Sequence, residues 1–425
     1  MEDSKTSKRL SLFLDSGIYR FENSNAIFVD PVRLLNRSYS QFRVSPSAYY
    51  SRFFDAKRVG SPGNEPNIPS SASKKRKRKV KPHSLNERER AADQRHQQMR
   101  PMLLNALQCL TAATDLLAVL RDLRTGFCSP ESRESALPGD EMSFIEHGCV
   151  WQAPLYEIVL NFPPHHMQRN DEGSPIDQCS GQKVLALFDN LVVNDTSYDV
   201  EAEFLDSKYI IPGQSCFYMS DLGQIHNLIP AEPYCGFNLI LIDPPWENAS
   251  ASQKIRYPTL PNRYFLSLPI KQLTHKDGAL VALWVTNREK LRNFVEKELF
   301  PTWGVSYEAT FYWLKVKADG SLISDLDLFH HRPYECLLLG YCHGEGTNSE
   351  QISTLRSALR DEIVISIPGD YSRKPPIGEL LLEHVPGPKP SRCIELFARE
   401  MINGWTSWGN EPLHFQKSSY FDTKK

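Results

Sequence analysis

The C-terminal half of the chain contains short apolar runs separated by segments long enough to form helices. Several runs are apolar at every position, as Leu239-Ile240-Leu241-Ile242 shows, so the corresponding strands would be buried on both faces. This alternation predicts an α/β fold in which helices cover both sides of a mostly parallel sheet. The expected strands are 216–219, 237–242, 279–285, 310–314, 336–339, 363–367 and 393–396.

The charge of the chain is divided unevenly between its ends. Residues 1–100 carry 21 Lys and Arg against 10 Asp and Glu, which leaves 28 against 41 for residues 101–425. Seven of the eight residues at 74–81 are cations, and their mutual repulsion predicts a solvated linker. Such a block is typical of a nuclear localisation signal or a phosphate-binding arm, with an inert charged run as the alternative.

The first half of the chain has a mixed pattern. Residues 10–50 carry short apolar runs, which we expect to form strands that dock on the rest of the protein. Leucines repeat at helical spacing over 85–123, which predicts an amphipathic helix pair interrupted at Pro101, and 156–160 and 184–188 have the composition of strands. We therefore expect an N-terminal arm at 1–98, a mixed α+β middle domain at 99–206 and the α/β domain at 207–425.

Cysteine spacing and hydropathy limit the class of protein. The nine cysteines form no Cys-x-x-Cys pair and no Cys/His array at zinc spacing, which favours a reduced intracellular protein without a structural metal. No run of about 18 apolar residues and no signal-peptide pattern is visible, so we expect neither membrane spanning nor secretion. The adjacent pairs His165-His166 and His330-His331 lack further ligands at fixed spacing and predict no metal site.

One apolar strand ends in a motif that can carry chemistry. The run 237–242 is followed by Asp243-Pro244-Pro245-Trp246, at the strand end where ligands bind in open α/β sheets. Two prolines stiffen the turn and leave the Pro244 carbonyl free to accept a hydrogen bond. Asp243 adds a carboxylate acceptor, and Trp246 could offer a flat face to a nucleobase. An exocyclic amine such as adenine N6 could be held between these two acceptors, and the alternative is a strand-ending turn with a core tryptophan.

Further motifs occur in the same order as in a known family. The Asp-Pro-Pro-Trp motif and the segments around it resemble the adenine-N6 methyltransferases that include the catalytic subunit of the eukaryotic messenger-RNA adenosine methyltransferase. The resemblance covers about residues 217–415 and implies a Rossmann-like methyltransferase domain that uses S-adenosylmethionine, without a metal. It rests on Tyr257-Pro258-Thr259-Leu260, Leu283-Trp284-Val285-Thr286-Asn287, Arg332-Pro333-Tyr334-Glu335, Ser372-Arg373-Lys374-Pro375 and Glu395-Leu396-Phe397-Ala398-Arg399.

The resemblance also implies roles for individual residues. Asp221 matches an acidic position on the adenosyl side of the cofactor, Lys374 a lysine near its methionine carboxylate, and Arg399 an arginine near its ribose. Where bacterial relatives have a Phe-x-Gly turn this chain has Phe397-Ala398-Arg399, which favours a side-chain grip on the ribose. The alternatives are a solvated Lys374 or Arg399 and a helix cap at Asp221. The expected cofactor residues are Asp221, Asp243, Lys374, Phe397, Arg399, Asn403 and Asn410.

The catalytic and substrate residues follow from the same motifs. We expect Asp243, Pro244, Pro245 and Trp246 to be catalytic. Cations and aromatic residues near the expected edge of the site are candidates for contact with a phosphate or a base. The expected substrate residues are Trp246, Lys254, Arg256, Tyr257, His331 and Arg332.

These observations predict an N6-adenine methyltransferase that acts on RNA in the nucleus as a monomer. The closing stretch Gly404-Trp405-Thr406-Ser407-Trp408 resembles one branch of the family, which implies small nuclear RNA with a 2′-O-methylated adenosine as the acceptor. DNA adenine presents the same amine and is the first alternative. A catalytically inactive RNA-binding partner subunit and a nucleic-acid binder that acts through the basic arm are the others.

Overall fold

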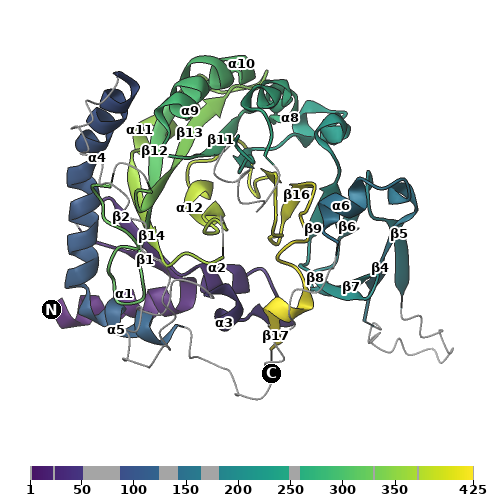
Figure 1. The fold of residues 1–425 in the computed structure, drawn as a ribbon, viewed down its shortest axis with the longest axis horizontal. Helices are drawn as coiled ribbons and strands as arrows, with labels where there is room; N and C mark the ends of the chain where they lie inside the picture. Colours follow the sequence, from purple (N-terminus) through teal and green to yellow (C-terminus); the bar gives the residue numbers. More distant parts are fainter. Residues whose placement is uncertain are drawn as a thin grey trace, which may run out of the picture.

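An eleven-stranded, mostly parallel sheet forms the centre of the protein, and a smaller four-stranded sheet lies beyond one edge (Figure 1). The structure is a computed structural model that describes residues 2–22, 24–50, 87–123, 142–163, 181–247, 259–328, 331–370 and 373–424. The strand order in the large sheet is β1-β2-β14-β12-β13-β11-β10-β15-β16-β9-β6.

The elements have the following bounds. The large sheet contains β1 (Ile18–Arg20), β2 (Ala26–Val29), β6 (Leu191–Asn194), β9 (Ser215–Met219), β10 (Leu239–Ile242), β11 (Ala279–Val285), β12 (Val305–Lys315), β13 (Tyr334–Cys342), β14 (Glu362–Ser366), β15 (Cys393–Leu396) and β16 (Trp405–Gly409). The small sheet contains β4 (Glu157–Asn161), β5 (Gln182–Ala186), β7 (Val200–Phe204) and β8 (Ser207–Ile211), and β3 (Phe42–Val44) pairs with β17 (Phe421–Thr423). The α-helices are α1 (Glu2–Ser16), α2 (Pro31–Asn36), α3 (Pro46–Tyr49), α4 (Glu87–Ala112), α5 (Thr114–Asp122), α6 (Phe144–Gly148), α8 (Ile270–Leu273), α9 (Glu289–Phe294), α10 (Phe300–Trp303), α11 (Ser349–Ala358) and α12 (Gly378–Leu382). Short turns of other helix types are η1 (Ala153–Leu155), η2 (Leu222–Leu228), η3 (Pro233–Cys235), η4 (Asn262–Ser267), η5 (Val295–Leu299) and η6 (Ser418–Tyr420).

Five neighbouring strands bring their carboxyl ends to one edge of the large sheet. β11, β10, β15, β16 and β9 pair in this order, and each pairing is parallel. The expected α/β fold with a mostly parallel sheet is confirmed, because the fully buried runs, β10 and β11 among them, lie at its centre. β16 was not among the expected strands, since Trp405-Thr406-Ser407-Trp408-Gly409 contains no continuous apolar run.

The N-terminal arm is part of the large sheet. β2 pairs in parallel with β14, and β1 pairs with β2 to form the sheet edge. The expectation that strands of the arm dock on the rest of the protein is therefore confirmed.

The expected helix pair is present, but it is not interrupted at Pro101. α4 continues through Pro101 to Ala112, and the axis then bends by 80° before α5. Pro101 and Gln97, four residues before it, are both exposed, so the Gln97 carbonyl that loses its helical partner can bond to water. No described helix is by itself long and apolar enough to cross a membrane. α4 and α5 together have the length and composition of a membrane span, but they form a bent pair.

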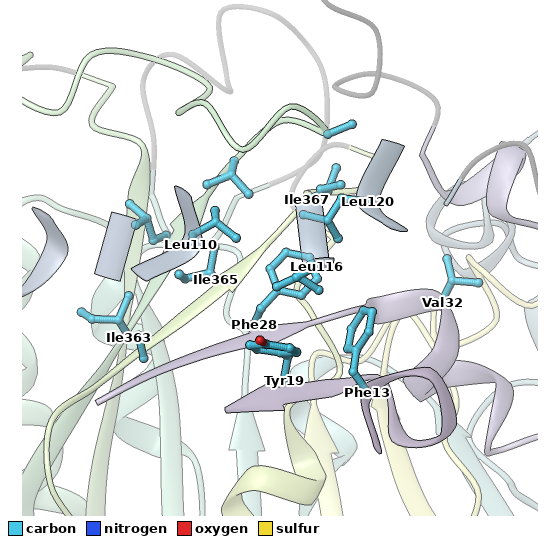
Figure 2. Packing of buried hydrophobic residues seen from close by; sticks show 14 of the residues in the cluster. Phe13, Tyr19, Phe28, Val32, Leu110, Leu116, Leu120, Ile363, Ile365 and Ile367 are labelled. Carbon is cyan, nitrogen blue, oxygen red and sulfur yellow. The ribbon is translucent and has the colours of Figure 1, made fainter. Parts of the chain in front are cut away.

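The arm, the helix pair and the sheet share one hydrophobic core. Figure 2 shows side chains from all three converging on one cluster. The arm contributes Phe13, Tyr19, Phe28 and Val32, the helix pair Leu110, Leu116 and Leu120, and β14 with the residue after it Ile363, Ile365 and Ile367.

This packing changes the expected domain boundaries. The boundary at 98/99 falls inside α4, and the boundary at 206/207 falls in the turn of the β7–β8 hairpin. The leucines of α4 and α5 are buried against the arm, whereas the small sheet packs against β9 through Phe217 and Met219. The expected middle domain at 99–206 is therefore two pieces that join different parts of the protein, because a leucine pattern predicts burial but not the surface that buries it.

We expect Phe28→Ala to destabilise the whole protein, because the ring is fully buried between the arm and the helix pair. Truncation of such a residue costs about 3–5 kcal/mol of unfolding free energy, measured by urea titration. Leu12→Ala, whose side chain is 55% exposed, is the matched control and should change little. Equal stabilities of the two variants would contradict the shared core.

Candidate active site

The edge formed by the strand ends encloses a cavity of about 1060 Å³. Asp243 follows β10, Phe397 follows β15, Asn410 follows β16, and Asp221 lies just after β9, and all four border the cavity. A second wall comes from α6 and η1, beside the small sheet. The position agrees with the general rule that ligands of open α/β sheets bind at the carboxyl ends of the strands.

The Asp-Pro-Pro-Trp turn is fixed by backbone hydrogen bonds. The Asp243 amide donates to the Leu396 carbonyl at 3.2 Å, and the Leu260 amide donates to the Pro245 carbonyl at 3.0 Å. The Pro244 carbonyl is not free as expected, because it accepts the Trp246 amide at 2.8 Å. Since a carbonyl oxygen has two lone pairs, it can still accept one further hydrogen bond.

Trp246 is a wall residue and not an exposed platform. Its side chain borders the cavity, but the residue is only 7% exposed. The indole donates to the Trp284 carbonyl at 2.8 Å, and the ring meets Phe265 edge to face. It therefore shapes the cavity beside Asp243. Trp246 is both a cavity-wall residue, as the functional interpretation expected, and a core residue, as the alternative expected.

A lysine whose side chain is only 13% exposed joins two carboxylates at the cavity. Lys374 Nζ lies 3.1 Å from Asp243 Oδ1 and 3.3 Å from Glu335 Oε2. Burial alone would lower the pKa of Lys374, but the two carboxylates outweigh it and raise that pKa. Burial likewise opposes ionisation of Glu335, yet Lys315 and Lys374 lower its pKa to about 2. Lys374 and Glu335 are therefore charged at neutral pH, and Lys374 holds one oxygen of Asp243 in place.

The residue before Lys374 anchors its loop to the N-terminal arm. The Arg373 side chain is 2% exposed and forms an ion pair with Glu400. Its guanidinium lies 4.3 Å from the ring centroid of Tyr49, in α3, and 4.2 Å from that of Phe415. The arm thus contacts the segment that carries Lys374, a link that the sequence pattern did not reveal.

A second, partly buried carboxyl group lies close to Asp243. Burial raises the pKa of Glu395, on β15, to about 8, and the negative charges of Asp243 and Glu400 add to this effect. At neutral pH Glu395 is therefore mostly protonated, while Asp243 accepts the lysine.

Six of the seven expected cofactor residues border the cavity, and Asn403 does not. Asp221 caps η2 by accepting the Gly223 and Gln224 amides, so it is both a helix cap and a wall residue. Phe397 adopts a left-handed φ of 61°, and its ring contacts Phe265 and Trp408. The Asn403 amide instead donates to the Gly213 carbonyl, away from the cavity. The six are Asp221, Asp243, Lys374, Phe397, Arg399 and Asn410.

The expected substrate residues are not all at the cavity. Lys254, Arg256 and Tyr257 lie outside the described residues, as does the basic block at 74–81. His331 and Arg332 do not border the cavity, contrary to expectation. The Arg332 side chain is 5% exposed and lies against α4, where it meets Asp93 at 3.4 Å, because a buried guanidinium needs such a partner.

The cavity also contains residues to which the sequence pattern assigned no role. Trp284 Nε1 and Thr286 Oγ1 are buried at its wall and have no hydrogen-bond partner within the described ranges. Arg263 and Tyr264 border it with exposed side chains. Trp284 and Thr286 lie in a segment that marked the resemblance, but only the fold shows that they face the same space as Asp243.

These groups fit S-adenosylmethionine. The cofactor carries an amino-acid end, a ribose with two hydroxyl groups and an adenine, and the wall offers carboxylates, cations and two buried polar atoms without partners. The volume of about 1060 Å³ exceeds that of an ordinary small-molecule pocket, so a nucleoside can enter beside the cofactor. The described residues contain no group of three or more His, Cys, Asp or Glu side chains placed to hold a metal ion.

Comparison with known proteins gives consistent matches. A family model described as MT-A70 matches residues 237–411. The chain is similar to the N(6)-adenine-specific methyltransferase METTL4 of Mus musculus, with 33% identity over 368 residues that cover 83% of this chain and 72% of that protein. It is 32% identical over 221 residues to the N6-methyladenosine RNA methyltransferase MTA1 of Pyricularia oryzae, a match that covers 50% of this chain and 56% of that protein. It is also 32% identical over 219 residues to the DNA N6-methyl methyltransferase of Caenorhabditis elegans, a match that covers 51% of this chain and 56% of that protein.

We expect Glu395 to make the unfolding free energy fall as the pH rises. The unfolded carboxyl loses its proton near pH 4.3 but the folded one only near pH 8, so the folded state holds the extra proton between these values. For each pH unit in this window, the unfolding free energy of the wild type should fall by about 1.4 kcal/mol relative to that of Glu395→Gln. The unfolding free energies of both proteins are measured at pH 5.5 and 8. Glu157→Gln, at an exposed site, should follow the wild type. Parallel pH profiles of wild type and Glu395→Gln would refute this assignment.

Proposed function

The chain belongs to the MT-A70 family, among its METTL4-like methyltransferases, and we propose that it methylates N6 of adenosine in RNA. Members of this family transfer a methyl group from S-adenosylmethionine, and N6 of adenine is the acceptor named for its relatives. The observation that carries the proposal is the position of the Asp243 carboxylate, held by Lys374, beside the Pro244 carbonyl in one large cavity.

The turn is suited to hold an exocyclic amine. One oxygen of Asp243 pairs with Lys374, and the other can accept one N–H of the amine. The remaining lone pair of the Pro244 carbonyl can accept the second N–H. Both acceptors then favour the positive charge that develops on the nitrogen as it attacks the methyl group.

The cofactor supplies an activated methyl group on a positively charged sulfur. In our proposal Asp221, Arg399 and Asn410 hold its adenosine part, and Phe397 closes the apolar side of the cavity. Lys374 already faces two carboxylates, so we assign to it the orientation of Asp243 in addition to any contact with the carboxylate of the cofactor. The buried indole and hydroxyl of Trp284 and Thr286 are available as further partners.

The choice of RNA, and of 2′-O-methyladenosine in small nuclear RNA, rests on the resemblance of the closing segment. β16 and the residues after it form one side of the cavity, so the segment that marks this branch lies where it can act on the bound groups. The basic block at 74–81 supports action in the nucleus. We propose a monomer, since the described part of the chain assembles the catalytic turn, the lysine and both cavity walls from one chain.

DNA adenine is the second candidate, favoured by the similarity to the DNA N6-methyl methyltransferase of Caenorhabditis elegans. An inactive RNA-binding partner subunit is less well supported, because Asp243, Lys374 and Arg399 are all present at the cavity.

We expect Asp243→Ala to abolish methyl transfer to adenosine while the protein stays folded. A charge-assisted hydrogen bond is worth roughly 1.5–3 kcal/mol, so kcat should fall by roughly ten- to a hundredfold from this loss alone, and further because Lys374 loses one of its two carboxylate partners. The measurement is transfer of labelled methyl groups, with folding checked by thermal melting. Asp206→Ala, at an exposed turn, is the control. Near-normal turnover by folded Asp243→Ala would contradict the mechanism.

A side-by-side assay tests the substrate. We expect methylation of an RNA oligonucleotide, with the highest kcat/KM when its adenosine carries a 2′-O-methyl group, and a lower value for DNA of matched sequence. Nucleoside analysis of the products identifies N6-methylated adenine. A preference for DNA would replace the RNA proposal. If the protein binds the cofactor but methylates none of the three oligonucleotides, the result would favour a non-catalytic partner subunit.

A further inference from the structure

A second cavity, of about 620 Å³, adjoins the catalytic one. It lies between the start of η4 and the outer face of the helix formed by α9 and η5, and it shares Glu247 and Arg263 with the catalytic cavity. The two cavities are therefore neighbours that share these two residues as a common border. The lining residues are Glu247, Pro261, Asn262, Arg263, Lys290, Asn293, Phe294, Lys297 and Glu298.

The helix presents two lysines and one carboxylate, that of Glu298, to this cavity. Leu291, Val295 and Leu299 are buried in the core, so the opposite face, with Lys290, Asn293 and Lys297, points outward. Both lysines are exposed and form no ion pair with a described carboxylate. These two cations lie on the same face of one helix, and both can contact negative groups in the cavity.

An arginine and a tyrosine mark the junction of the two cavities. The Arg263 side chain is 77% exposed and lies 3.5 Å from Glu298, an exposed pair that contributes little rigidity. Tyr264 is 55% exposed and borders the catalytic cavity. Bonds from the Tyr264 amide to Pro261 and from the Ser267 hydroxyl to the Tyr264 carbonyl fix this turn. An exposed ring next to a guanidinium is suited to stack a base beside a phosphate.

We propose that the second cavity binds the nucleotides next to the target adenosine in the same strand. Lys290, Lys297 and Arg263 contact the phosphodiester backbone, and the ring of Tyr264 stacks on the adjacent base. The interspersed carboxylates of Glu247 and Glu298 fit a strand that alternates phosphates with amine-bearing base edges, and they disfavour a continuous acidic protein segment. This inference rests on the proposed function of the catalytic cavity.

The test compares Lys290→Gln/Lys297→Gln with wild type, both as full-length chains. Binding of a fluorescent single-stranded RNA with one adenosine is measured by anisotropy at several salt concentrations. We expect the dissociation constant to rise roughly tenfold and the slope of log K against log salt to fall by about 0.7 per lost phosphate contact. Lys271→Gln, an exposed lysine outside both cavities, should match wild type. Cofactor affinity by calorimetry should be unchanged in all variants.

A second pair of variants tests the tyrosine. Tyr264→Phe keeps the ring and should bind the RNA as wild type does, whereas Tyr264→Leu should weaken binding roughly tenfold. The same loss in both variants would overturn the stacking role.

The outcomes separate this inference from the proposed function. If the lysine variant binds RNA with wild-type affinity and salt slope while wild type methylates RNA, the second cavity is not a strand site and the function stands. If wild type methylates no oligonucleotide but the lysine variant loses RNA binding as expected, the cavity binds nucleic acid and the function is wrong. A hexaglutamate peptide serves as a probe for an acidic protein segment. If the lysine variant still binds RNA but no longer binds this peptide, which wild type does bind, the cavity is a site for an acidic protein segment and the proposal is overturned.

Discussion

A largely buried lysine between two carboxylates links the segments that form the catalytic cavity. Lys374 comes from the loop before α12, Asp243 from the end of β10 and Glu335 from β13, so one ammonium group joins three distant segments. Buried charges are tolerated only in mutual contact, because each would be costly to desolvate alone. The position of Asp243 therefore depends on its partners as much as on the rigid proline turn.

The same loop explains why the N-terminal arm belongs to the catalytic unit. Arg373 is held between Tyr49 and Phe415 and paired with Glu400, directly before Lys374. β2 pairs with β14, and β3 pairs with β17 near the end of the chain. Segments at both ends of the sequence thus support the loop that carries the lysine, and the arm has a structural role that is separate from the basic block that follows it.

The catalytic cavity alone does not distinguish RNA from DNA, since both present the same adenine amine to Asp243 and Pro244. Selection between polymers must come from contacts to the sugar and to the neighbouring nucleotides. In our proposal such contacts come from walls beyond the strand ends, formed by α6 and η1 at the catalytic cavity and by α9 and η5 at the second cavity. Relatives that share the strand ends can therefore differ in substrate.

The sequence by itself determined the α/β class, most strand positions and the strand end that carries Asp243, because buried strands and proline turns are local patterns. Lys374, Arg399 and Asn410 were expected only from the resemblance to the family. It did not determine partners. Whether Arg332 faces a substrate or Asp93, whether the leucines of α4 meet the arm or the small sheet, and whether the Pro244 carbonyl is already bonded depend on segments far apart in the chain. Only the tertiary structure decided these points, since burial and pairing are set by what packs against a residue and not by its neighbours in sequence.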